Sequence, residues 1–489
     1  MDEQPLNTTD ADELLTSASP SNSKLPPLSR DVAFYSITVT QFLGAFNDNV
    51  FKQILLLMFV AVPIGITATS TDTGSAIQIE TPVKTIEAEI ASGTLENPSV
   101  EKLNGTLNSA TTMDLQPLAT FVFALPFVLF SGYAGYLSDR FSKRRVIVLS
   151  KVTELVIMAI GLALFASYSA TGLTMSLVIF LSATLFLMGT QSTFFGPGKY
   201  GILPELFDNK DLPSANGLIL MTTFLAIILG SALAGQLLDA FPGQLWVSGL
   251  FCVVIAAIGI GTCLGIRKVA PSSAGIRFEW GNLAIPQEIR ALLRKDKAIM
   301  FAVSASSVFW LAASMVLMAV NSLGELQLHT SKLETGLLIS SVSVGIAFGS
   351  IIAGAISKNY FRGDLIQIGA WGAALTLSAL AIPPITGSPH ILGYYGCMAA
   401  LILLGGFTGV FAVPLQVFLQ SRPPDALKGR MIATQNLLNW IGILLSAGIY
   451  ALATAAFALL DAPVNAMFGV TAVIMAGIGL FYRPKTISL

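Results

Sequence analysis

Twelve apolar stretches, each long enough to cross a bilayer as a helix, follow one another along the 489-residue chain. A backbone in lipid must satisfy its own hydrogen bonds, so such stretches are expected to be helical. Only 11% of the residues are charged, against about 25% in an average soluble domain. We therefore expect an all-α membrane protein with twelve transmembrane helices. The predicted spans are residues 32–63, 115–137, 146–167, 173–195, 214–240, 244–266, 298–323, 333–356, 364–386, 391–418, 430–457 and 463–482.

Two long polar connections organise these spans. Residues 64–114 form a loop rich in Thr, Ser and Glu, and residues 267–297 separate six helices from six helices. We predict a polar tail over residues 1–30, a first bundle over residues 31–266 and a second bundle over residues 298–489. Within the central linker, proline followed by an amphipathic pattern (Pro286–Lys295) indicates either a short helix on the inner membrane surface or a solvated linker with one helical turn.

The placement of basic residues predicts the orientation. With the N-terminus in the cytoplasm, 22 of the 27 Lys and Arg residues fall on the cytoplasmic side, and three fall outside. Cytoplasmic loops of membrane proteins carry such an excess of Lys and Arg. We therefore expect a multi-pass protein with both termini in the cytoplasm and the 64–114 loop outside.

Few residues in the chain are suited to catalysis or metal binding. The net charge of −1 gives no sign of a nucleic-acid partner. Cys252, Cys263 and Cys397 lie within apolar segments, where they are typical of buried thiols rather than of disulfides or metal ligands. We find no nucleophile or metal cluster, and we expect no enzyme activity, no cofactor and no metal.

The first span nevertheless contains a charged centre. Asp48 is flanked by Asn47 and Asn49, and Lys52 follows one helical turn later. Ionisable groups at this depth are expensive and usually mark a substrate or ion pathway. We predict that these four residues bind substrate or couple transport to an ion. The alternative is that Asp48 and Lys52, spaced i,i+4, neutralise each other as a structural pair.

Other polar residues inside the spans are candidates for the same site. Gln191, Gln435, Asn436 and Asn439 either line a cavity or form hydrogen bonds between helices. Lys151 and Glu154 lie in the third span. They are expected to form a pair that snorkels to the inner surface, with a coupling carboxylate as the alternative.

The loop after the second span reads GYLSDRFSKRR and resembles the loop signature of the major facilitator superfamily. The resemblance implies a twelve-helix major facilitator fold and a conformational gate at this loop. Gly135 would let helices approach closely, and Asp139 would accept hydrogen bonds that hold the inner face shut. The basic residues alone would also satisfy the orientation rule. The remaining gate candidates in this loop are Arg140, Arg144 and Arg145.

A second group of gate candidates follows the fourth span, which is expected to end at Gly196-Pro197-Gly198. Lys199 and Glu205 come directly after it. They form either part of an ion-pair network or an ordinary solvated turn.

Several blocks are more specific and resemble the bacterial lysophospholipid transporter family. These blocks are QFLGAFNDNVFK at Gln41–Lys52, FGPGKYGILPEL at Phe195–Leu206, SANGLI at Ser214–Ile219, GGFTGVFAVPLQVFLQ at Gly405–Gln420 and GRMIATQN at Gly429–Asn436. The resemblance implies alternating access, a lysophospholipid or another amphipathic molecule as substrate, and membrane lipids and a separate acyltransferase as partners. It also implies a place in the bacterial inner membrane, and we expect a monomer. A major facilitator exporter of drugs or small metabolites is the alternative.

The chain departs from that family at two points. A fused acyltransferase would need a His and an Asp separated by four residues, and neither His329 nor His390 is followed by Asp at this spacing. In addition, some members carry a glutamate, a basic residue and a glutamate where this chain has Leu220, Leu317 and Asn439. If those charges bind the lipid headgroup in the family, we expect this protein either to recognise the headgroup differently or to carry another substrate.

Overall fold

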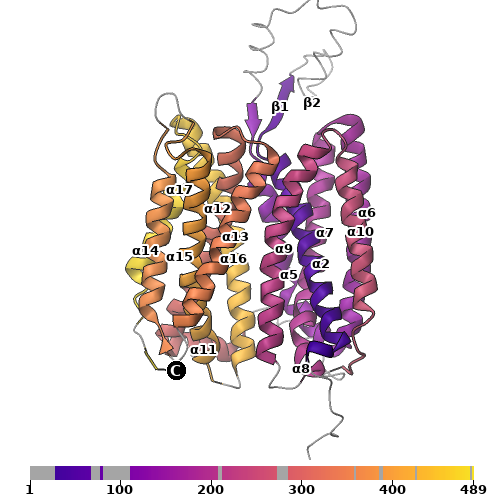
Figure 1. Cartoon of the computed structure of the whole chain (residues 1–489), viewed down its shortest axis with the longest axis vertical. Helices are drawn as coiled ribbons and strands as arrows, with labels where there is room; N and C mark the ends of the chain where they lie inside the picture. Colours follow the sequence, from indigo (N-terminus) through magenta and orange to yellow (C-terminus); the bar gives the residue numbers. More distant parts are fainter. Residues whose placement is uncertain are drawn as a thin grey trace, which may run out of the picture.

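Two helical bundles stand side by side in the computed structural model (Figure 1). Both the start of the first long helix and the C-terminal strand lie on one face, which we call the terminal face. The opposite face is called the distal face. The structure describes residues 28–67, 78–80, 111–207, 212–271, 285–356, 360–384, 389–424, 427–484 and 487–488.

Over its described residues, the first bundle contains six long helices. A short 3-10 turn (Leu28–Arg30) precedes them, and α8 (Leu203–Leu206) lies among them. Asp31 caps the first long helix, because its carboxylate accepts a hydrogen bond from the backbone N–H of Ala33 at 2.8 Å. The long helices are α2 (Val32–Met58), α5 (Gln116–Arg140), α6 (Lys143–Thr171), α7 (Met175–Gly201), α9 (Leu212–Ala240) and α10 (Leu245–Cys263).

The second bundle also has six long helices over its described residues, and they follow α11 (Gln287–Lys295). That nine-residue helix confirms helical structure in the central linker, and Ile289 on it is buried against the second bundle. A π-helical turn η3 (Leu323–Gln327) extends the first long helix of this half. The long helices are α12 (Lys297–Ser322), α13 (Lys332–Ile356), α14 (Gly363–Leu380), α15 (Gly393–Ser421), α16 (Lys428–Leu459) and α17 (Ala466–Phe481).

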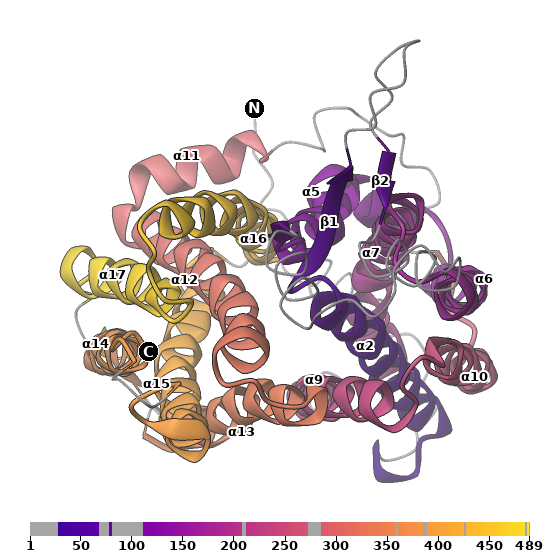
Figure 2. The same ribbon diagram turned by 90° about the horizontal axis from the view of Figure 1, so that it is seen from above.

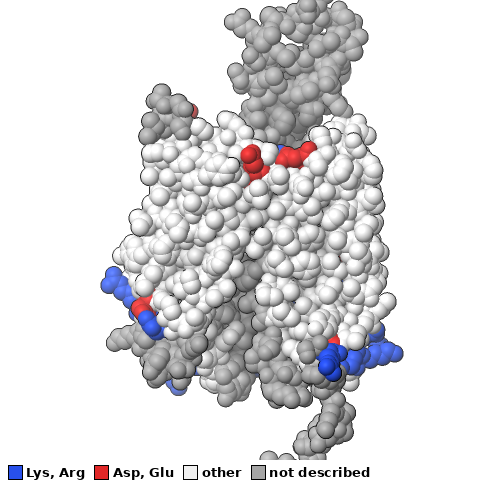
Figure 3. Space-filling model, viewed as in Figure 1, with Lys and Arg blue, Asp and Glu red and all other residues white. Residues whose placement is uncertain are grey.

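Nine of these helices, within the described residues, are long and apolar enough to cross a membrane. The other three are α2, α14 and α17. Helix α2 carries the amide and charged residues of the first predicted span, and α17 has only 16 residues. In the view of Figure 3, the described surface around the middle of the bundle is largely uncharged, and most Lys and Arg side chains lie toward the terminal face, as suits a protein in a bilayer.

Short strands lie outside the helical bundles, where the sequence analysis expected only loops. β1 (Val62–Thr67) pairs antiparallel with β2 (Gln78–Glu80) and with β3 (Thr111–Met113) on the distal face. On the terminal face β4 (Tyr360–Phe361) pairs with β5 (Ile487–Ser488). Such short strands cannot be found from hydropathy, because hydropathy identifies only long apolar segments.

The fourth predicted span does not end at its Gly-Pro-Gly sequence. Helix α7 continues through Pro197 to Gly201. Helices in membranes tolerate proline when neighbouring groups satisfy the freed backbone. The last turn also packs closely on α6, because a Cβ added at Gly198 would lie 3.3 Å from Ile147. This turn is therefore part of the first bundle and not a loop.

The two bundles meet along α9 with α13 and along α5 with α16 (Figure 2). Hydrogen bonds between described residues of the two halves all lie in the distal half of the molecule. For example, Asp239 at the end of α9 accepts from the backbone N–H groups of Lys332 and Leu333 at 3.1 and 2.6 Å. These contacts close the distal face.

Candidate functional site

A cavity of about 230 Å³ lies between the halves and extends into the second bundle. Its polar end comes from α2, where Asn49, Lys52 and Gln53 face it. Most of its wall is apolar and comes from α12, α13, α14, α15 and α17. The apolar lining consists of Ile227, Phe309, Ala312, Ala313, Val316, Leu317, Val320, Ile339, Val342, Ile346, Leu377, Leu404 and Met475. The cavity is thus amphipathic.

Lys52 is the basic side chain in this lining. Its ammonium lies 5.3 Å from the ring centroid of Phe123, close enough for a cation–π interaction. No carboxylate among the described residues approaches this ammonium within 4 Å. An aromatic wall continues across the halves, because Phe127 stacks on Trp440 with ring centroids 3.7 Å apart. A phosphate would therefore meet an ammonium that has no close counter-ion in the described structure.

Asp48 points away from this cavity, although it is one turn from Lys52. One carboxylate oxygen accepts a hydrogen bond from Ser192 on α7 at 2.6 Å. The other oxygen is buried without a partner in the described structure. The structure therefore does not bring Asp48 and Lys52 together as a close ion pair.

Asn47 joins a third group inside the first bundle. Its amide donates to Glu154 at 3.0 Å, and Glu154 pairs with Lys151 at 2.6 Å. The prediction that this pair snorkels to the surface is wrong, since the side chains of Lys151 and Glu154 are only 1% and 2% exposed. Gly44 makes room for the ammonium, because a Cβ there would lie 2.2 Å from Lys151 Nζ.

The remaining polar candidates fall in two places. On α16, Gln435 donates to Gln416 at 2.8 Å and to Ser306 at 3.3 Å, and Asn439 accepts from the same serine at 3.0 Å. They link helices of the second bundle and are absent from the cavity lining. Gln191 on α7 is buried and accepts from Ser192 at 3.1 Å. Asn436 is exposed.

The loop between α5 and α6 does not form a latch in this conformation. Asp139 is exposed and makes no hydrogen bond or ion pair with a described residue. A Cβ at Gly135 would meet nothing within 4 Å, so the expected close helix approach is not present here. Arg140 donates to Tyr136, Arg145 is exposed, and Arg144 donates to two carbonyls after α10 at 2.6 and 2.9 Å.

The two gate candidates after Gly198 take different positions. Glu205 forms an ion pair with Lys143 at the start of α6, within the first half. Lys199 lies over aromatic rings, with its ammonium 4.8 Å from the centroid of Tyr200 and 5.8 Å from that of Phe195. Neither bridges to the second half through a described contact.

A buried polar chain that the sequence alone did not predict joins the halves at the distal face. Gln53 donates to Asn321 at 2.8 Å, and Asn321 donates to Gln116 at 2.8 Å. Gln116 in turn donates to Ser322, which lies 3.1 Å from the hydroxyl of Tyr450. The sequence does show amide side chains near the ends of three predicted spans. It does not show which amides pair, because partners such as Gln53 and Asn321 are 268 residues apart in the chain.

Asp114 completes this chain just before α5. It accepts hydrogen bonds from the backbone and side chain of Gln116 at 2.9 and 3.3 Å. Burial nevertheless raises the pKa of Asp114 to about 6, because desolvation of the carboxylate outweighs these hydrogen bonds.

Among the described residues, no group of three or more His, Cys, Asp or Glu side chains could hold a metal ion. The geometry instead supplies an amphipathic cavity, a closed distal face and a buried charged group in the first bundle.

Comparison with solved structures supports the fold. An inward open conformation of the xylose transporter XylE from E. coli has a TM-score of 0.59 at 15% identity, covering 92% of this chain and 96% of that chain. The nucleoside transporter NupG gives a TM-score of 0.61 at 11% identity, covering 93% and 98%. These likenesses show the fold alone.

Sequence relatives are more specific. The lysophospholipid transporter LplT of Enterobacter sp. is 30% identical over 348 residues, which cover 70% of this chain and 80% of that protein. LplT of Cronobacter sakazakii is 29% identical over 349 residues, covering 69% and 79%. The sequence model of the Major Facilitator Superfamily matches residues 89–447. The chain is therefore a transporter that belongs to the major facilitator superfamily, in the branch that contains the LplT proteins.

Proposed function

We propose that this transporter moves a lysophospholipid across the bacterial inner membrane by alternating access. The observation that carries the proposal is the amphipathic cavity between the halves. A lysophospholipid has a phosphate in its headgroup and one acyl chain. Lys52 provides a cation for the phosphate, and the apolar wall of the second bundle provides a surface on which part of the chain can pack.

The cavity also accounts for the departure from the family pattern. Leu317 stands where some family members carry a basic residue, and it lines the cavity as an apolar side chain. Lys52 lies in the same lining, so the phosphate can be held from α2 instead of α12. The presence of Lys52 in the lining supports the same substrate class as in the family, with the headgroup bound by a different residue.

The closed distal face fits one state of an alternating-access cycle. Opening would break the contacts of Asp239 with α13 and the polar chain around Asn321. In the opposite state the loop containing Asp139 would form its latch. Asp48 with Ser192, and Glu154 with Asn47 and Lys151, are the candidate coupling groups of this cycle.

Binding to the purified protein tests the substrate. We expect a fluorescent lysophospholipid to bind, Lys52→Gln to weaken binding about tenfold or more, and Lys52→Arg to retain most of it, because arginine keeps the charge. Equal binding by Lys52→Gln and the unchanged protein, each normalised to folded protein, would contradict the proposal.

The alternative is an exporter of drugs or small metabolites. A cationic dye would be repelled by Lys52, so Lys52→Gln would improve its binding. Efflux of dyes without any lysophospholipid binding would support this alternative. The partner acyltransferase and the monomeric state remain proposals from the family resemblance.

A further inference from the structure

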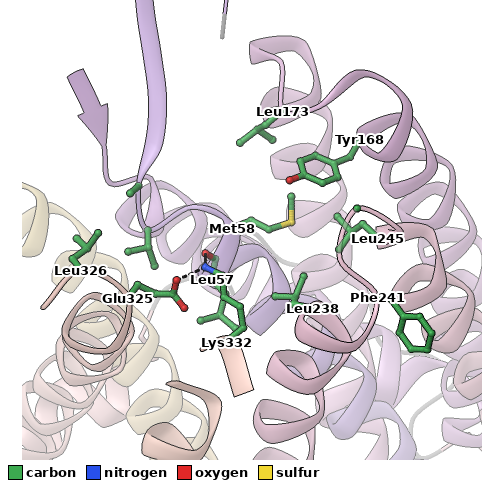
Figure 4. Close-up of a pocket in the computed structure, with 13 residues that line it drawn as sticks. Leu57, Met58, Tyr168, Leu173, Leu238, Phe241, Leu245, Glu325, Leu326 and Lys332 are labelled. Atoms are coloured by element: carbon green, nitrogen blue, oxygen red, sulfur yellow. Dashed lines mark hydrogen bonds and ion pairs between the residues drawn. The ribbon is translucent and has the colours of Figure 1, made fainter. Parts of the chain in front are cut away.

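A second cavity lies at the distal face, separate from the one between Lys52 and the second bundle. Its volume is about 450 Å³, within the range of small-molecule sites. The ends of α2, α6, α9 and α10 from the first half and of η3 and α13 from the second half surround it (Figure 4). Helix ends are at the level of lipid headgroups in a bilayer.

One side of this cavity carries a pair of opposite charges. Glu325 on η3 and Lys332 at the start of α13 form an ion pair. The ammonium of Lys332 also donates to the carbonyl of Leu57 on α2 at 3.3 Å. The side chains of Lys332 and Glu325 remain 34% and 13% exposed, so a ligand can reach both charges.

The other side is apolar, with one phenol. Met58, Leu238 and Leu245 lie across the cavity from the ion pair, as does Tyr168 (Figure 4). The hydroxyl of Tyr168 makes no hydrogen bond with any described residue and is available to a ligand. Such a lining suits a molecule that is charged at one end and apolar at the other.

The Glu325–Lys332 ion pair is not needed to hold the two halves together. Asp239 already accepts two backbone hydrogen bonds from the start of α13, and the Asn321 chain adds a second connection. A purely structural ion pair would also be expected to pack closely, without a cavity of this size beside it.

We propose that this distal cavity is a first binding site for a zwitterionic lysophospholipid headgroup. Glu325 would bind the ammonium, and Lys332 would bind the phosphate. The ligand exchanges one internal ion pair for two, so little net charge is left unpaired. The proposal rests on the proposed function, because it assigns a second site to the same substrate class.

The test compares two headgroups on the full-length protein in nanodiscs. Lysophosphatidylethanolamine has an ammonium and a phosphate, whereas lysophosphatidylglycerol has only the phosphate. All binding is measured in a Lys52→Gln background, which weakens the central cavity. Glu325→Gln should weaken ethanolamine-lipid binding about tenfold and leave glycerol-lipid binding unchanged or tighter. Lys332→Gln should weaken both.

Two further variants separate recognition from structure. The double variant Glu325→Lys with Lys332→Glu exchanges the charges and keeps an ion pair. We expect it to lack the preference for the ethanolamine lipid, as Glu325→Gln does. Asp364→Asn is the matched control, because it breaks the exposed Arg362–Asp364 pair on the terminal face. It should leave both affinities unchanged.

The outcomes also separate this proposal from the proposed function. If Glu325→Gln changes both lipids equally, or the charge exchange restores binding, the distal site is wrong while lysophospholipid transport by the unchanged protein can still be measured. If the unchanged protein neither binds nor takes up any lysophospholipid, both proposals are overturned.

Discussion

At the scale of single residues, α2 distributes its polar side chains among different surroundings. Lys52 and Asn49 face the cavity between the halves, Asp48 faces Ser192, and Asn47 faces Glu154. Residues one position apart on a helix are turned by about 100°, so consecutive polar residues cannot all face one cavity. Each residue therefore has its own expected phenotype.

The double variant Asp48→Asn with Lys52→Gln tests whether these two residues merely neutralise each other. In that case the double variant would be milder than either single variant, because a single change leaves a lone buried charge. We expect the double variant to fold and to remain inactive, since Lys52 is needed in the cavity. Near-normal lysophospholipid uptake by the double variant would contradict the assignment of Lys52.

The raised pKa of Asp114 predicts that the stability of the protein depends on pH. Its pKa is about 6 in the folded protein against 3.8 in the unfolded chain, so the folded state binds more protons between these values. Stability should therefore fall as the pH rises from about 4 to 6, and Asp114→Asn should flatten this fall. The measurement is Tm against pH.

Asp296 is the control for that experiment. Its pKa is lowered by the hydrogen bond and charge of Arg422 and by backbone N–H groups, which outweigh desolvation. Asp296→Asn should therefore lower Tm by a nearly constant amount above about pH 4 and change the slope of the profile only below that pH, where the unchanged protein loses its ion pair as the pH falls. If Asp114→Asn has the same Tm profile as the unchanged protein, the raised pKa of Asp114 does not contribute to the pH dependence.

At the scale of elements, glycines determine how closely α13 approaches α15. A Cβ at Gly345 would lie 2.0 Å from the carbonyl oxygen of Ile402, and one at Gly349 would lie 2.0 Å from that of Gly406. Small residues spaced by four allow such approach in membranes. Both helices line the cavity between the halves, so this contact also sets the shape of its apolar wall.

Gly349→Ala should destabilise the second bundle by about 1–3 kcal/mol, because its methyl group would overlap backbone atoms. Gly354→Ala on the same helix is the matched control, since a Cβ there meets nothing within 4 Å. Thermal unfolding of both variants in detergent is the measurement. Equal stabilities would show that the close contact does not constrain the helices.

At the scale of the whole molecule, hydropathy predicts the helical bundles, and the resemblance of the GYLSDRFSKRR loop to the superfamily signature implies the major facilitator fold. These signals are local and strong along each span. The three surroundings of α2, the burial of Lys151 with Glu154 and the chain around Asn321 could not be predicted, because they depend on which helix faces each residue. The continuation of α7 past Pro197 was missed because proline is a helix breaker in water.

The orientation remains a prediction for the whole molecule. A tag at either terminus should be shielded in intact bacterial cells, because the basic residues should keep the terminal face in the cytoplasm. Permeabilised cells serve as the control, in which both tags should be labelled. Labelling of either tag in intact cells would show that the predicted orientation is wrong.

Uptake of a labelled lysophospholipid into liposomes that contain the purified protein tests the central claim most directly. Besides the unchanged protein, the experiment uses Lys52→Gln at the polar end of the cavity and Ala312→Trp in its apolar wall, with Ala163→Trp on the exposed side of α6 as the control. We predict uptake by the unchanged protein and the control, and a loss of about tenfold or more in the two cavity variants. Absence of uptake by the unchanged protein, or equal uptake by all four, would contradict the account.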